Sequence, residues 1–170
     1  MHEYDVAVLI PRVLLALIMF MHGKNHWRGP GGVQGTARWF GGIGLQPAIV
    51  HAWMSVVIEF AAAAGFLLGL FNPLACTATV AVMTVAGIAE HRKNGFFVFK
   101  EGYEYVLYIA GTCVALGILG PGKYSLDRAL GIDDNLDGWT GGGIALLGVL
   151  GAAAMLAVCW RPEKKPAPAT

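Results

Sequence analysis

The chain has 170 residues, of which 56% are hydrophobic and 14% charged, and its net charge is +1. A soluble domain carries about 25% charged residues, and a nucleic-acid-binding protein needs cations gathered on one face, so the composition argues against both classes. The apolar residues fall in long blocks, as in membrane helices, which need roughly 20 apolar residues to cross a bilayer core of about 30 Å. The sequence therefore predicts an all-α membrane protein.

Five apolar blocks are visible along the chain. They span residues 6–21, 48–71, 74–89, 103–119 and 141–160. The first block follows acidic residues and no cation, and no small-residue cleavage site comes after it, so we expect it to stay in the mature protein. In the last block Gly148 and Ala152 stand four residues apart, a spacing that favours close packing of helices in lipid.

The segments between the blocks are polar or rich in glycine and proline. We expect a flexible loop after the first block, with residues 36–40 lying at the membrane surface through Trp39 and Phe40. An acidic segment precedes the fifth block, and the tail at 163–170 is rich in Pro and Ala and is expected to be disordered. The three cysteines lie inside apolar blocks without a CxxC spacing, which indicates small buried side chains.

The cations give the expected orientation. If five helices cross the membrane, nine Lys and Arg residues fall on one side, two on the other, and Arg12 lies within the first block. The nine are Lys24, Arg28, Arg38, Arg92, Lys93, Lys100, Arg161, Lys164 and Lys165. Since loops rich in Lys and Arg stay in the cytoplasm, we expect the carboxyl terminus inside and the amino terminus outside a bacterial-type inner membrane.

Two ionisable residues fall at membrane depth, where charge is costly. Glu59 lies about eleven residues into the second block, too deep for so short a side chain to reach the surface, so it is either protonated or paired inside the bundle. Arg12 lies about two turns from the outer end, and either extends outward or pairs with a carboxylate in the bundle.

Polar residues gather at the cytoplasmic ends of the predicted helices. His22 and Lys24 are expected to end the first helix and His91 the third, while Glu104 begins the fourth. Because successive helices alternate in direction, these residues fall at one depth, with Glu59 below them. Such a cluster is suited to bind a quinone head group, relay protons or ligate a metal. A further histidine, His26, follows Gly23, which we expect to end the helix.

The chain resembles the DoxX-type membrane proteins. The residues that carry the resemblance are His22-Gly23-Lys24, Gly41 to Pro47, Glu59 with the small residues after it, Gly69-Leu70, Gly95-Phe96-Phe97 before Glu104, and Gly120 to Asp127. The resemblance implies a four-helix transmembrane bundle over residues 1–131, to which this chain adds an acidic loop and a fifth transmembrane helix over 132–162 and the tail at 163–170. It also maps His22, Lys24, Glu59, His91 and Glu104 onto the family's recurrent polar positions.

Our first functional hypothesis follows from the cluster and from the family, which takes its name from a small subunit of an archaeal thiosulfate–quinone oxidoreductase. It is an integral membrane subunit of a quinone-linked redox system that binds a quinone, or relays protons, through the His/Glu cluster. A metal held by His22, His91 and Glu104 is the weaker alternative, because water and Lys24 would compete there.

Two other functions stay open. One is a non-catalytic accessory or scaffold subunit that docks through the fifth helix, and the other is a small lipid or solute carrier with Glu59 in its path. The expected partners are membrane lipids and other membrane subunits or further copies of the chain. The lack of a CxxC, haem or nucleotide motif argues against electron transfer by this chain alone, and the sequence does not decide whether it is an enzyme.

Overall fold

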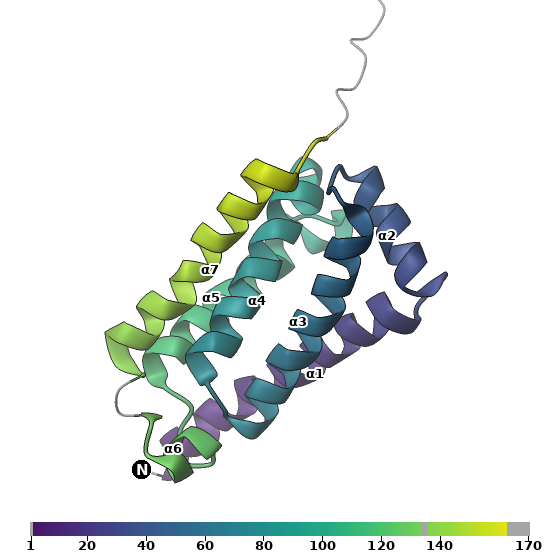
Figure 1. Ribbon diagram of the computed structural model, residues 1–170. Coiled ribbons are helices and arrows are strands. Elements are labelled where there is room, and N and C mark those ends of the chain that lie inside the picture. Colours follow the sequence, from purple (N-terminus) through teal and green to yellow (C-terminus); the bar gives the residue numbers. More distant parts are fainter. Residues whose placement is uncertain (1, 134–135, 163–170) are drawn as a thin grey trace, which may run out of the picture.

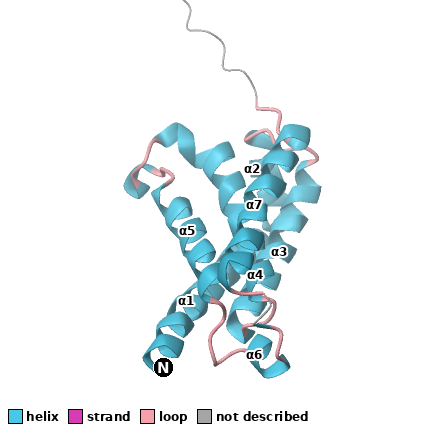
Figure 2. Ribbon diagram, turned by 90° about the vertical axis from the view of Figure 1, so that its left-hand side faces the viewer, coloured by secondary structure: helices cyan, strands magenta, loops and turns pink. Residues whose placement is uncertain are grey.

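Seven α-helices make up the described part of the computed structural model, residues 2–133 and 136–162 (Figure 1). The helices are α1 (His2–Arg28), α2 (Gly32–Gly42), α3 (Ala48–Leu68), α4 (Asn72–Ala86), α5 (Glu104–Leu119), α6 (Leu126–Leu130) and α7 (Gly138–Cys159). Helices and loops account for every described segment in Figure 2. The prediction of an all-α chain is confirmed. The predicted disordered tail lies outside the described residues.

Four helical segments are long and apolar enough to cross a membrane. They are Glu3–Arg28, Ala48–Leu68, Asn72–Asn94 and Gly138–Cys159, and the shorter apolar helix Glu104–Leu119 joins them. The 16 residues of α5 reach about 24 Å, short of a bilayer core of about 30 Å. Each of the five predicted apolar blocks thus corresponds to a helix.

The end of the first helix was predicted wrongly. α1 continues through Gly23 to Arg28, so Gly23 is an interior residue of the helix. It has a packing role instead, because a Cβ placed on it would lie 3.3 Å from the Cβ of Glu59 on α3. The glycine lets α1 and α3 approach closely, and the longer helix adds His26 to the bundle.

The segment after α1 is also more regular than expected. A loop was predicted, but α2 forms there, entered through Gly31 and Gly32, both of which have positive φ angles. α2 buries Ala37 and Phe40 against the bundle while Trp39 stays 47% exposed. Glycines at both ends of the segment weakened the helical signal in the sequence.

The fifth apolar helix is part of the bundle. Gly148 of α7 lies so close to α4 that an added Cβ would meet the backbone oxygen of Thr77 at 2.4 Å. The Thr77 hydroxyl also donates a hydrogen bond of 2.7 Å to the carbonyl of Ile144. α7 therefore packs tightly on α4, as the spacing of Gly148 and Ala152 predicted.

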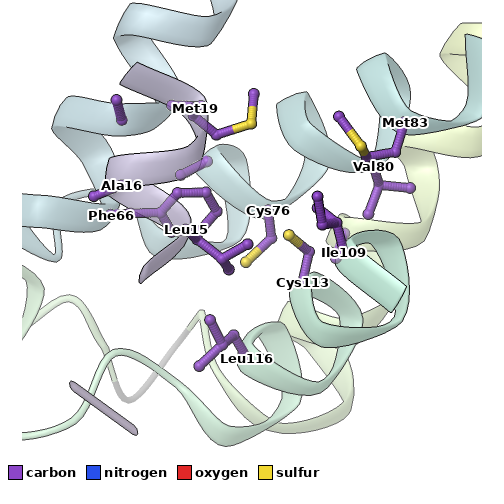
Figure 3. Packing of buried hydrophobic residues seen from close by; sticks show 14 of the residues in the cluster. Leu15, Ala16, Met19, Phe66, Cys76, Val80, Met83, Ile109, Cys113 and Leu116 are labelled. Atoms are coloured by element: carbon purple, nitrogen blue, oxygen red, sulfur yellow. The ribbon is translucent and has the colours of Figure 1, made fainter. Parts of the chain in front are cut away.

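A mostly aliphatic core fills the middle of the bundle (Figure 3). Phe66, Met19 and Ile109 from three different helices are almost fully buried in it. Cys76 and Cys113 are buried there as free thiols, as the sequence predicted.

Several contacts gather one set of loops and helix ends at one end of the bundle. Leu45 pairs with Trp160 in an isolated bridge, and Arg161 donates from its backbone N–H to the carbonyl of Gly44 at 2.7 Å. The guanidinium of Arg92 lies 5.5 Å from the ring centre of Trp160. The first loop, the end of α4 and the end of α7 thus share one end, as expected for the cation-rich side.

Arg12 marks the other end. It is 1% exposed, so the expectation that it extends outward is wrong. The buried carboxylate of Asp127 is near enough to act on its charge, but its hydrogen bonds go to backbone carbonyls. Nε donates to Phe66 at 2.9 Å, Nη1 to Pro121 and to Tyr124 at 2.9 Å, and Nη2 to Leu67 at 3.4 Å. The guanidinium thereby holds the end of α3 against the segment that follows α5.

Candidate functional site

Three polar side chains lie at intervals of four residues along the buried face of α3. They are His51, Ser55 and Glu59, all buried, and Glu59 is 0% exposed. Residues four apart lie above one another on a helix, so the three form a polar stripe on an apolar helix. Glu59 lies near the middle of α3, which confirms the expectation that its carboxylate is inside the bundle.

His26 of α1 completes a closed hydrogen-bond network with this stripe. Its Nδ1 lies 2.9 Å from Oε2 of Glu59 and 2.9 Å from Oγ of Ser55. The Ser55 hydroxyl donates to Oε1 of Glu59 at 3.0 Å, so both carboxylate oxygens are used. The Thr36 hydroxyl of α2 also donates to the carbonyl of His26 at 2.9 Å. The costly buried carboxylate is therefore paired and hydrogen-bonded.

This network lies in the wall of a cavity of about 300 Å³ between α1, α2, α3, α4, α5 and α7. Most of the lining is apolar. The aliphatic and sulfur-containing part includes Ile43, Leu45, Met54, Ile58, Val82, Met83, Val85 and Met155, and the aromatic part is Trp39, Phe40 and Tyr105. Polar groups enter from only a few positions, an arrangement typical of a pocket for a small apolar ligand with a polar head.

Two further histidines line the cavity near its rim. His22 stacks on Tyr105 of α5, with ring centres 6.3 Å apart and planes inclined by 18°. His91 follows α4 in a π-helical segment, Gly87–His91, and its Nδ1 lies 2.7 Å from the carbonyl oxygen of Glu101. Glu90 lines the cavity as well and pairs with Lys93 at 3.1 Å.

The structure brings together three of the five residues that the sequence singled out. His22, Glu59 and His91 all line the cavity. Lys24 is exposed and Glu104 is not among the lining residues. The Glu104 carboxylate instead accepts the backbone N–H of Val98 at 2.9 Å, which fixes the turn before α5.

The metal hypothesis gains no support from this geometry. Within residues 2–133 and 136–162, no group of three or more His, Cys, Asp or Glu side chains is arranged to hold a metal ion. Of the proposed ligands, His22 and His91 face the cavity, while Glu104 binds its own turn.

The sequence reasoning missed His26, Ser55 and Tyr105. The signal for His26 was present, because His22 and His26 stand four residues apart, but Gly23 was taken for a helix end. Ser55 and His51 share the four-residue spacing with Glu59, which marks one helix face. Tyr105 carries no local signal, because only the fold places α5 beside α1.

Comparisons with known proteins agree with this architecture. The family model of DoxX matches residues 7–92, from the first turns of α1 to just beyond α4. Inner membrane protein YphA of Escherichia coli is 31% identical over 128 residues, covering 72% of this chain and 89% of that protein. Inner membrane protein YqjF of the same organism is 25% identical over 131 residues, or 74% of this chain and 93% of that protein. No solved structure gives a significant match. Because the family model matches half of the chain, and a relative that is 31% identical covers 72% of it, the chain belongs to the DoxX family of membrane proteins.

Proposed function

We propose that this protein is an inner-membrane subunit that binds the ring of a quinone-type lipid in the cavity. Glu59 and His26 relay protons to and from that ring. The observation that carries the proposal is the buried, hydrogen-bonded pair of Glu59 and His26 in the wall of an otherwise apolar cavity. An ionisable pair at membrane depth is costly to keep, and it is typically kept for proton or ligand chemistry.

The size and lining of the cavity fit a single aromatic ring. A volume of about 300 Å³ is at the lower end of the range for small-molecule pockets, about 300–1,000 Å³. Trp39, Phe40 and Tyr105 offer ring faces for stacking, while the histidines and Glu59 offer hydrogen bonds. A quinone ring suits the same two features, because it has a flat, conjugated, largely apolar body and polar oxygen substituents.

We further propose that all five apolar helices cross the membrane, with the amino terminus outside and the carboxyl terminus in the cytoplasm. The loops and helix ends that carry most of the cations share one end of the bundle, and cation-rich ends stay inside. The inner membrane is the location named for both relatives. The cavity then lies nearer the cytoplasmic face, because His22 and His91 line it close to that end.

The experiment is a binding titration on the purified protein in mild detergent. A tailless benzoquinone such as 2,3-dimethoxy-5-methyl-1,4-benzoquinone is added, and binding is followed calorimetrically. We expect Glu59→Gln to weaken binding about tenfold, since it removes the charge that polarises His26. The matched control is Glu104→Gln, whose amide oxygen still accepts the Val98 N–H, and which should bind as the unmodified protein does. Equal affinity in Glu59→Gln and the unmodified protein would contradict the role of Glu59.

As a subunit, the protein is expected to act with other membrane proteins or with copies of itself. Interconversion of a quinone and a quinol needs an electron donor or acceptor, and this sequence carries no CxxC motif. Protein extracted gently from its native membrane should therefore migrate as an assembly well above 18.0 kDa plus detergent. A mass matching one chain would contradict the subunit role.

A further inference from the structure

The hydrogen bonds around Glu59 fix where the proton of His26 lies. The single proton of the Ser55 hydroxyl goes to Oε1 of Glu59, so Ser55 has none left to donate to His26. The two atoms near Nδ1, Oγ of Ser55 and Oε2 of Glu59, both act as acceptors toward it. With Glu59 ionised, Nδ1 therefore carries a proton. In the neutral ring, Nε2 is then an acceptor, the tautomer that a carboxylate partner enforces on a histidine.

The Nε2 atom of His26 is open to the cavity. His26 lines the cavity, and none of its hydrogen bonds to the described residues uses Nε2. Among those residues, the fully buried side-chain atoms without a partner are Oδ1 of Asn72 and Oδ1 of Asp133, so Nε2 is not sealed in the protein. A ligand in the cavity has access to it.

Two other histidines of the cavity lining also have one ring nitrogen assigned by a hydrogen bond. Nδ1 of His91 faces the carbonyl of Glu101 at 2.7 Å, and Nε2 of His51 faces the carbonyl of Gln46 at 3.3 Å. A carbonyl oxygen only accepts, so each of these nitrogens must donate, and the second nitrogen of each neutral ring is left as an acceptor. His22, the Tyr105 hydroxyl and the indole N–H of Trp39 are lining groups able to donate.

From the unpaired Nε2 of His26 we infer that the cavity selects the reduced, hydroxyl-bearing form of its ring ligand, with this nitrogen accepting the hydrogen bond of one ring hydroxyl. The inference rests on the proposed function and deepens it by naming the form of ligand. A quinol hydroxyl donates to Nε2, whereas a quinone carbonyl has only lone pairs to offer there. An unpaired acceptor at this position disfavours a ligand without a matching donor, since both partners then lose their hydrogen bonds to water.

The test compares ligands that share one ring. They are 2,3-dimethoxy-5-methyl-1,4-benzoquinone, its quinol kept reduced without oxygen, and the dimethyl ether of that quinol, which cannot donate. Binding to the full chain in detergent is measured by calorimetry. We expect the quinol to bind about tenfold more tightly than the quinone and the ether, the effect of one unmatched hydrogen bond.

A variant then assigns the preference to His26. His26→Asn places an amide N–H near the position of Nδ1, so it still donates to Glu59, but it has no atom at Nε2. We expect it to bind quinol and ether with equal affinity. His26→Gln carries an amide oxygen near the position of Nε2 and should keep part of the preference. It also serves as the second variant if His26→Asn does not fold, as judged by its melting temperature.

The outcomes separate the two proposals. A quinol preference that disappears in His26→Asn supports the inference. Equal binding of quinol and ether by the unmodified protein overturns the inference and leaves the proposed function standing, because the ring still binds. A quinol preference that survives in both variants overturns the role of His26. If no ring compound binds at all, the proposed function itself fails.

Discussion

Arg12 shows how a buried cation is held mainly by backbone carbonyls, with the buried carboxylate of Asp127 near enough to act on its charge. Its guanidinium donates to four backbone carbonyls, those of Phe66, Leu67, Pro121 and Tyr124. Carbonyls at the end of a helix lack partners within the helix, so one planar group with five donors satisfies several of them. The residue joins segments that are more than fifty positions apart along the chain.

Replacing Arg12 tests how much these carbonyl contacts stabilise the bundle. Arg12→Lys keeps the charge but loses the fork of donors, so some buried carbonyls are left without partners. We expect a loss of about 1–3 kcal/mol of stability, seen as a lower melting temperature in detergent. Arg28→Lys is the control, at the exposed end of the same helix, and should melt as the unmodified protein does. Equal melting of both variants would show that the carbonyl contacts contribute nothing.

For individual residues, the sequence predicted how deep a side chain lies in the bundle better than which way it faces around its helix. The cost of charge in a membrane identified Glu59, and helix ends placed His22 and His91 at the right level. Depth does not determine which way a side chain faces around its helix, however. Lys24 and Glu104 lie near the same end, but neither lines the cavity. Their directions follow from helix rotation, which depends on packing with neighbours that a single sequence does not specify.

At the scale of elements, α7 offers a pair of glycines with opposite surroundings. An added Cβ on Gly148 would meet the Thr77 oxygen at 2.4 Å, whereas one on Gly143 meets nothing within 4 Å. We therefore expect Gly148→Ala to push α7 away from α4 and to cost about 1–3 kcal/mol. Gly143→Ala should be neutral or slightly stabilising, because alanine favours helix. Melting temperatures of the two variants decide; a stable Gly148→Ala variant would mean that α7 packs loosely.

The elements differ in how clearly the sequence predicted them. Long apolar stretches in the sequence predicted α1, α3, α4, α5 and α7, because a helix inside a lipid bilayer must be apolar over its length. α2 did not, since its 11 residues are too few to give a strong periodic signal and glycines border them. Its role is also tertiary, since Phe40 and Thr36 contact His26 on α1. The sequence alone does not predict a helix of this kind, because its contacts with the site become apparent only in the folded structure.

At the scale of the whole molecule, two exposed lysines at opposite ends of the bundle allow the proposed orientation in the membrane to be tested. Lys123 lies beside Asp5 near the amino terminus, and Lys100 lies in the turn before α5. In a background without the native cysteines, a membrane-impermeant maleimide added to intact cells should label Lys123→Cys and spare Lys100→Cys. Opening the membrane should then expose the second site. The reverse pattern would invert the proposed orientation.

The cavity wall is shared by the two ends of the chain, and this sets the order of events during synthesis. His22 and His26 on α1 line the same space as Ala152 and Met155 on α7. Because synthesis runs from the amino terminus, α1 and α3 are made before residue 155 of α7 leaves the ribosome. We therefore expect the pair of Glu59 and His26 to form while the wall contributed by α7 is still missing, and the last helix to complete the enclosure.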